Sequence, residues 1–222
     1  MKEIKIQNQN IIDILNECVW FYDNRDQLKD IKCNHQDKNS EDYLNDTDKL
    51  KVIKAGSSHN GYPEILKGYN IRDYNGAMFN DKSNSHIPKT FVDKYNDISK
   101  RLMTELAVRN NAVATLYPPS GFISWHTNAN ASGFNLIFTW SETGDGYFEY
   151  IDENGETVRL QDAKNEWVCR YGMFGEYFQT KHPIVYHAAY TDCWRMTLGF
   201  IFSKEDIAGD LQDFIIEEIS NP

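Results

Sequence analysis

Apolar residues recur every three to four positions in three stretches of the chain, residues 11–23, 88–106 and 204–219. This spacing is typical of amphipathic helices that cover a larger body. Pro88 begins the second stretch, where its fixed φ angle suits the first turn of a helix. The apolar positions of this second helix are Phe91, Tyr95, Ile98, Leu102 and Leu106. We therefore expect an N-terminal helix, a central helix and a C-terminal helix docked on a β domain.

Between the second and third of these helices the period of the apolar pattern falls to about two, which is typical of short β-strands. Eight such runs follow one another, and eight is the number of strands in a double-sheet jelly roll. The runs are 112–117, 122–126, 134–140, 147–151, 156–160, 166–174, 184–187 and 193–202. Before the fifth run, Asn154-Gly155 tolerates the positive φ angles of a tight hairpin. The predicted fold class is mainly β with flanking helices, around a double-stranded β-helix core of the jelly-roll or cupin type.

The remaining stretches predict less regular structure. Residues 24–58 are rich in charged and amide side chains, which indicates a surface loop with one short helical turn. Residues 65–79 mix Tyr and Ile with two glycines and predict one or two short strands. A chain of 222 residues fits a single domain of this class. Its expected parts are helical and loop support over 1–111, the jelly-roll core over 112–203 and the C-terminal helix over 204–222.

Composition and charge exclude several classes of protein. The hydrophobic share of 41% and aromatic share of 14% predict a folded chain. The net charge of −10, without a Lys/Arg cluster, argues against a protein that binds nucleic acid by neutralising phosphates. The N-terminus has no apolar signal segment, and no apolar run is long enough to span a bilayer. The four cysteines show no metal-binding spacing, so we expect free thiols in a soluble, cytoplasmic protein of undefined oligomeric state.

Candidate metal ligands lie at His126, Asn128 and His187. His126 and Asn128 are two positions apart at the end of a predicted strand, so that both side chains point the same way. His187 comes from a distant strand of the same barrel. Mononuclear iron(II) oxygenases hold their metal with two imidazoles and one carboxylate arranged on one face of the ion. The pattern therefore indicates a metal site in which an amide replaces the carboxylate.

From residue 112 to residue 202 the chain resembles the iron(II)- and 2-oxoglutarate-dependent oxygenases, most closely their prolyl-hydroxylase-like branch. The segments that carry the resemblance are Tyr117-Pro118-Pro119-Ser120-Gly121, His126-Thr127-Asn128, residues 134–140, Gly144-Asp145-Gly146-Tyr147-Phe148, His187-Ala188-Ala189 and Arg195-Met196-Thr197-Leu198-Gly199-Phe200. The resemblance implies iron(II) and 2-oxoglutarate as cofactors and O2 as cosubstrate. It also implies hydroxylation of a substrate that the sequence does not identify, either a small molecule or a peptide or protein side chain.

The resemblance also assigns an anion site to Arg195. The family places a basic residue shortly after the second histidine, where it binds the distal carboxylate of 2-oxoglutarate. A guanidinium can form two parallel hydrogen bonds to such a carboxylate, and in a closed barrel Arg195 would otherwise be an unpaired buried charge. Thr197, on the same face of its strand, and Tyr117, in the strand before His126, are the hydroxyl groups expected to assist.

Asn128 departs from the family pattern, which has Asp or Glu at this position. An amide oxygen coordinates metal more weakly and without charge, and Asn also serves in turns because it hydrogen-bonds its own backbone. Some branches of the family use only two histidines and water, or a halide where a small residue replaces the acid. Asn128 is therefore a third ligand, a turn residue or the mark of altered or lost activity. The last possibility leaves a second hypothesis, a non-catalytic jelly-roll binding protein.

Other polar and aromatic residues are weighed against structural roles. Trp140, Tyr147 and Tyr150 can line a substrate pocket, although aromatic residues in β domains are more often part of the core. His182 competes with His187 but precedes Pro183, as in a loop. His35, His59 and His86 lie in polar stretches and are expected to be solvated, whereas Cys169 and Cys193 are expected to fill the core. Substrate specificity is expected within residues 57–84.

Overall fold

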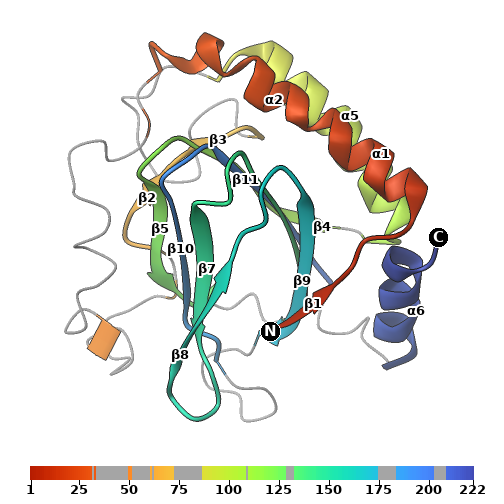
Figure 1. The fold of residues 1–222 in the computed structure, drawn as a ribbon. Coiled ribbons are helices and arrows are strands. Elements are labelled where there is room, and N and C mark those ends of the chain that lie inside the picture. Colours follow the sequence, from red (N-terminus) through yellow and green to blue (C-terminus); the bar gives the residue numbers. More distant parts are fainter. Residues whose placement is uncertain are drawn as a thin grey trace.

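The structure is a computed structural model that describes residues 1–31, 33, 50–51, 61, 63–72, 87–108, 110–128, 133–174, 184–202 and 209–222. Two antiparallel sheets face each other in it (Figure 1). The strands are β1 (Lys2–Ile4), β2 (Leu66–Lys67), β3 (Tyr69–Asn70), β4 (Asn110–Tyr117), β5 (Gly121–His126), β6 (Gly133–Ser141), β7 (Gly146–Ile151), β8 (Thr157–Gln161), β9 (Trp167–Phe174), β10 (His187–Thr191) and β11 (Arg195–Ile201).

The connectivity of the strands is that of a jelly roll. One sheet has the strand order β1-β9-β6-β11-β4-β3, and the other has the order β2-β5-β10-β7-β8. From β4 to β11 the chain crosses repeatedly between the two sheets, and each of these eight strands corresponds to one of the eight predicted runs. The predicted fold class, a double-stranded β-helix with flanking helices, is confirmed.

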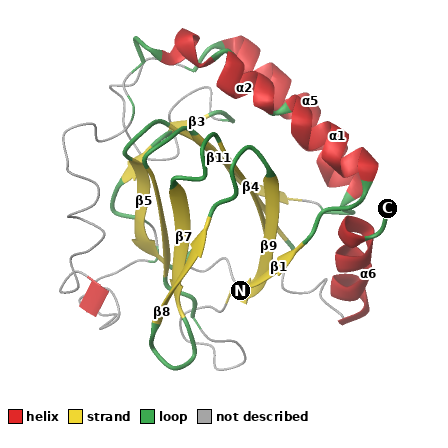
Figure 2. Ribbon diagram, viewed as in Figure 1, coloured by secondary structure: helices red, strands yellow, loops and turns green. Residues whose placement is uncertain are grey.

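The helices cover the outer face of the six-stranded sheet (Figure 2). They are α1 (Gln9–Glu17), α2 (Val19–Asp23), the short 3-10 helix η1 (Arg25–Leu28), α5 (Lys89–Glu105) and α6 (Gly209–Ser220). The five apolar positions predicted for the central helix are all buried, in α5 or directly after it. No helix among the described residues is long and apolar enough to cross a membrane.

The two faces of strand β11 contribute to different parts of the molecule. Met196, Leu198 and Phe200 belong to the apolar core between the sheet and the helices. Arg195 and Thr197 alternate with them and line a cavity inside the barrel. Because successive residues of a strand point to opposite faces, one sheet supplies both surfaces. The main apolar core therefore lies outside the barrel, and the inner face carries many polar side chains.

Residues 66–70 close one side of the barrel. Strand β2 pairs with β5 in the five-stranded sheet, and β3 pairs with β4 in the six-stranded sheet. Gly68, between them, permits this crossing because an added Cβ would lie 2.7 Å from Thr115 Cγ2. The prediction of short strands in this region is confirmed for residues 66–70, and residues 73–79 lie outside the described part of the chain.

Two predicted elements differ in their bounds. The single helix expected over residues 11–23 is divided at Cys18, whose amide bonds to Leu15 O at 2.9 Å and so ends α1 with a tighter turn. Leu15, Cys18 and Phe21 are all buried across the break, so the apolar pattern continues through it. The run expected over residues 184–187 lies too early, because the ladder with β5 and β7 begins at His187. Ala188 and Ala189 have low β propensity, yet they pack in a central strand, where context outweighs propensity.

Two further predictions are confirmed at the ends of the barrel. In the hairpin between β7 and β8, Asp152 Oδ1 accepts the amides of Asn154 and Glu156, each at 2.9 Å, and Gly155 has a φ angle of +82°. Helix α6 docks beside β1, because Ile219 is fully buried and its carbonyl accepts the Gln7 amide at 2.8 Å. Residues 204–208, where this helix was expected to begin, are outside the described part of the chain.

Candidate metal and anion site

His126 and His187 lie side by side inside the barrel. His126 ends β5, His187 begins β10, and the two are direct partners in the ladder between these strands. Their ring centres are 4.0 Å apart. Nδ1 of His126 is 2.8 Å from Ser124 O, and Nδ1 of His187 is 2.9 Å from Val185 O. A carbonyl oxygen only accepts, so each Nδ1 carries a proton, and in the neutral form of the ring the lone pair is then on Nε2.

Burial keeps His187 in the form that a metal requires. The histidines are 6% and 4% exposed, and the rings of Phe148 and Phe174 have centres 5.6 and 4.8 Å from that of His187. Burial lowers the pKa of His187 to about 4, because a charged ring would lose its hydration. The ring is therefore neutral at pH 7, which is the state of a ligating imidazole.

A cavity of about 220 Å³ brings the predicted site residues together. Its wall contains His126, Asn128, His187, Tyr117, Arg195 and Thr197. Two arginines, Arg72 and Arg195, also belong to this wall, whereas none of its described residues is Asp or Glu. In a chain with a net charge of −10, this cavity has a local composition suited to an anion.

Asn128 has the backbone conformation of a turn residue and also lines the cavity. Its φ angle is +63°, in the left-handed region that Asn tolerates better than most residues. It also lines the same cavity as the two histidines. The described residues contain no group of three His, Cys, Asp or Glu side chains that fits a metal. The three predicted ligand residues, His126, Asn128 and His187, therefore lie in the lining of one cavity.

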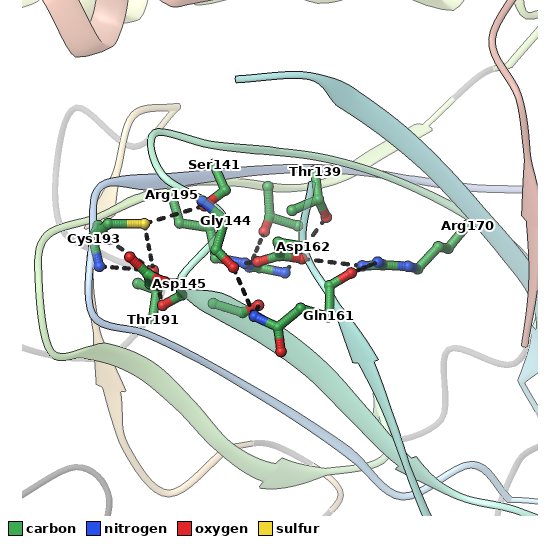
Figure 3. Close-up of polar contacts among 12 residues, drawn as sticks. Thr139, Ser141, Gly144, Asp145, Gln161, Asp162, Arg170, Thr191, Cys193 and Arg195 are labelled. Carbon is green, nitrogen blue, oxygen red and sulfur yellow. Dashed lines mark hydrogen bonds and ion pairs between the residues drawn. The ribbon is translucent and has the colours of Figure 1, made fainter. Parts of the chain in front are cut away.

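Arg195 is not an unpaired charge, and the expectation that it would be one without a bound carboxylate is wrong. Its Nε donates to Asp162 Oδ2 at 2.6 Å, and its Nη1 donates to Thr197 Oγ1 at 2.6 Å (Figure 3). Nη2 is 3.5 Å from Thr139 Oγ1. The other carboxylate oxygen of Asp162 accepts from Arg170 Nη1 at 3.2 Å. Sequence reasoning missed Asp162, because a carboxylate directly after a strand usually marks a solvated turn.

Tyr117 stands beside Arg195 in the cavity wall. The Arg195 guanidinium carbon is 5.6 Å from the centre of the Tyr117 ring, and the two residues are partners in the ladder between β4 and β11. Burial raises the pKa of Tyr117 to about 12, so its phenol is neutral and is able to donate a hydrogen bond. Arg195, Thr197 and Tyr117 thus lie together on the inner face of the six-stranded sheet.

The remaining candidate residues either pack away from the cavity or lie outside the described part of the chain. Trp140 packs in the outer core against Tyr22, with ring centres 5.1 Å apart, and Tyr147 belongs to an apolar cluster of the five-stranded sheet. Neither of them, nor Tyr150, lines the cavity. Cys169 and Cys193 are buried free thiols, as are the other two cysteines. The histidines at 35, 59, 86 and 182, and most of residues 57–84, lie outside the described part of the chain.

The fold and the cavity define a jelly-roll protein with a cavity inside the barrel. No protein-family model matches the chain, and no curated protein matches it. Among solved structures, a Pseudomonas putida prolyl-4-hydroxylase is 9% identical over 91% of both chains, with a TM-score of 0.40. OsALKBH1 is 12% identical over 72% of this chain and 94% of its own, with a TM-score of 0.29. A cupin domain from Bordetella pertussis is 14% identical over 42% of this chain and 82% of its own, with a TM-score of 0.25.

Proposed function

We propose that this chain is an iron(II)- and 2-oxoglutarate-dependent dioxygenase that hydroxylates a second substrate. The observation that carries the proposal is the shared cavity, whose lining contains both histidines and Arg195 and no described carboxylate. A metal site and an anion site at opposite parts of one small cavity suit a ligand that has a metal-chelating end and a carboxylate end. 2-Oxoglutarate is such a ligand.

His126, His187 and Asn128 would hold the iron. All three donors are neutral, so iron(II) with dianionic 2-oxoglutarate gives a complex without net charge, which suits a buried position. When bound, the metal supplies the oxidising chemistry that converts 2-oxoglutarate and O2 to succinate and carbon dioxide and places one oxygen atom on the substrate. The backbone carbonyls of Ser124 and Val185 fix the tautomers of the two rings, as partners of metal-bound histidines commonly do.

The other end of the cavity would bind the distal carboxylate. Arg195 has five N–H groups, of which Nε and one each on Nη1 and Nη2 are directed to Asp162, Thr197 and Thr139. One N–H on each Nη nitrogen remains for a ligand. Thr197 Oγ1 accepts from Arg195, so its own proton is available for the same carboxylate, and the neutral Tyr117 phenol can donate as well.

A second candidate function is a metal-independent binding protein for a carboxylate ligand. The cavity wall favours it in one respect, because the usual acidic ligand is replaced by Asn128 while the arginine side of the cavity is complete. This alternative needs Arg195, Thr197 and Tyr117 but not the two histidines. The two functions therefore differ in whether the histidines matter for ligand binding.

Anaerobic titration of the full chain with iron(II) and 2-oxoglutarate tests the proposal. We expect a visible charge-transfer absorption band that requires both additions and disappears in His126→Ala and in His187→Ala. Tyr150→Phe is the matched control, because Tyr150 is the ladder partner of His187 but does not line the cavity. Binding of 2-oxoglutarate that is equal with and without metal, and unchanged in both histidine variants, would support the second candidate instead. Absence of metal uptake at millimolar iron would contradict the dioxygenase.

A further inference from the structure

Asp162 is a buried carboxylate that lies behind Arg195 as seen from the cavity. It follows β8, and its side chain is 1% exposed. Arg195 and Thr197 line the cavity, whereas Asp162 is not part of the wall. Asp162 therefore contacts Arg195 from outside the cavity lining. Figure 3 shows the contact between the two side chains.

The local backbone is built around this carboxylate. The Asp162 amide donates to Gly146 O at 2.9 Å, which ties the end of β8 to the start of β7. A Cβ on Gly146 would lie 2.7 Å from Asp162 Oδ2 and 2.9 Å from Thr191 Oγ1. Any side chain at position 146 would thus displace the carboxylate, so the glycine leaves room for Asp162 to reach Arg195.

Two buried arginines share the charge of Asp162. Oδ2 accepts from Arg195 Nε, and Oδ1 accepts from Arg170 Nη1. Both guanidinium side chains are nearly inaccessible, at 1% and 2%. Arg170 has a further partner in Glu3, whose side chain is 58% exposed, at 3.3 Å. Together these residues form an ion-pair group of two arginines and two carboxylates, in which Glu3 is the exposed member and Asp162 bridges the two arginines.

The contacts fix how Arg195 presents itself to the cavity. Asp162 holds the Nε atom, so the guanidinium cannot turn this edge toward a ligand. Thr197 and Thr139 accept from Nη1 and Nη2, which keeps the planar group in one orientation. A guanidinium held in this way offers its two outer N–H groups to a carboxylate with less loss of side-chain freedom on binding.

We propose that Asp162 is a positioning residue that aims the outer N–H groups of Arg195 at the ligand carboxylate and so determines selectivity for 2-oxo acids with a distal carboxylate. This inference rests on the proposed function, since it takes 2-oxoglutarate as the ligand. Asp162 itself does not touch the ligand. Its effect is transmitted by the Arg195 guanidinium alone.

The test compares two ligands that share the metal-chelating end. 2-Oxoglutarate has the distal carboxylate, and 2-oxobutyrate lacks it. We would measure the affinities of both for the cobalt(II)-loaded full chain and for its Asp162→Asn variant. The expected result is at least about a tenfold loss of 2-oxoglutarate affinity, as for loss of a charge-assisted contact, with little change for 2-oxobutyrate. A general structural defect would weaken both ligands together.

Controls separate this inference from the proposed function. Glu3→Gln removes the exposed end of the same ion-pair group and should leave both affinities unchanged. If the wild type binds 2-oxoglutarate and Asp162→Asn binds it with the same affinity, this inference alone is overturned. If the wild type does not bind 2-oxoglutarate, the proposed function is overturned as well. If Asp162→Asn does not fold, Asp162→Glu keeps the charge but moves it by one methylene. It should lower the ratio of 2-oxoglutarate to 2-oxobutyrate affinity, and an unchanged ratio would contradict the inference.

Discussion

At the scale of single residues, the ion pair between Arg195 and Asp162 stands apart because both side chains are 1% exposed. Removal of one partner of a buried pair typically costs about 3–5 kcal/mol when the other charge is left uncompensated. In Arg195→Leu the Asp162 carboxylate keeps its contact with Arg170, so we predict that the free energy of unfolding falls by less than about 3–5 kcal/mol and that adding Asp162→Asn recovers part of the loss. Urea denaturation of the two single variants and the double variant measures the coupling. If the losses of unfolding free energy in the two single variants add up in the double variant, the predicted coupling between Arg195 and Asp162 is contradicted.

Two substitutions of Asn128 test separately whether it ligates the metal and whether it serves the turn. Glycine adopts a φ angle of +63° without strain, so Asn128→Gly should keep the free energy of unfolding within about 1 kcal/mol. If Asn128 is the third donor, the same variant lowers iron(II) affinity, whereas Asn128→Asp raises it by about tenfold or more through the added charge. Competition with a metal-sensitive dye measures both affinities. Equal affinity in all three proteins would show that Asn128 serves the turn alone.

Sequence reasoning found the predicted ligand residues of the cavity wall, but not Arg72 in that wall or Asp162 behind it. His126, His187, Arg195, Thr197 and Tyr117 stand in a recognisable order along strands, and the cavity brings them together. Asp162 is different, because its contacts depend on Gly146 and on two arginines from separate strands. A lone Asp after a strand has no local pattern that separates a buried bridge from a solvated turn.

At the scale of elements, α1 is joined to α5 by a pair of hydrogen bonds from Arg101 to Glu17, at 2.7 and 2.8 Å. These bonds, with a smaller contribution from Lys94, lower the pKa of Glu17 from its usual 4.5 to about 2. Because the pKa is lower in the folded state, the stabilisation is complete above about pH 4.5 and is lost as the pH falls toward 2. The pair is more than one-third exposed, so its contribution should be under about 1 kcal/mol.

We predict that Glu17→Gln reduces the loss of stability on acidification between pH 4.5 and 2. Chemical denaturation of both proteins at several pH values in this window measures the difference. The two stability curves should converge at the acid end and separate above pH 4.5. Parallel curves over the whole window would contradict the assigned role of the Arg101 contact.

Periodicity predicted the elements better than their ends. The central helix and strands β4, β6, β9 and β11 were found because each has one apolar face that packs in the outer core. Strands β5, β7 and β10 contribute instead to the smaller apolar cluster of the five-stranded sheet. The break at Cys18 does not interrupt the apolar face of residues 11–23, so the apolar spacing does not reveal it. The start of β10 depends on ladder contacts with β5 and β7. Both features come from hydrogen bonds between backbone groups, which the order of apolar side chains does not encode.

At the scale of the whole molecule, the proposed anion site lies inside a protein with a net charge of −10. The field of the protein should repel dianionic 2-oxoglutarate before it reaches the cavity, and salt screens this repulsion over about 10 Å at 0.1 M. We predict that raising ionic strength from about 20 to 200 mM increases the association rate several-fold. Stopped-flow measurements test this, and the monoanion 2-oxobutyrate should respond less. A rate that falls with salt would mean that local positive charge, such as Arg72, dominates the approach.

We propose that one ligand joins the histidine pair to Arg195 across a single cavity. The most direct test of this proposal is a crystal structure of the anaerobic complex with iron(II) and 2-oxoglutarate, with anomalous data collected at the iron edge. We expect an anomalous peak within bonding distance of Nε2 of both His126 and His187, and density for the distal carboxylate against the Nη atoms of Arg195. A peak elsewhere, or a ligand carboxylate that does not contact Arg195, would contradict it.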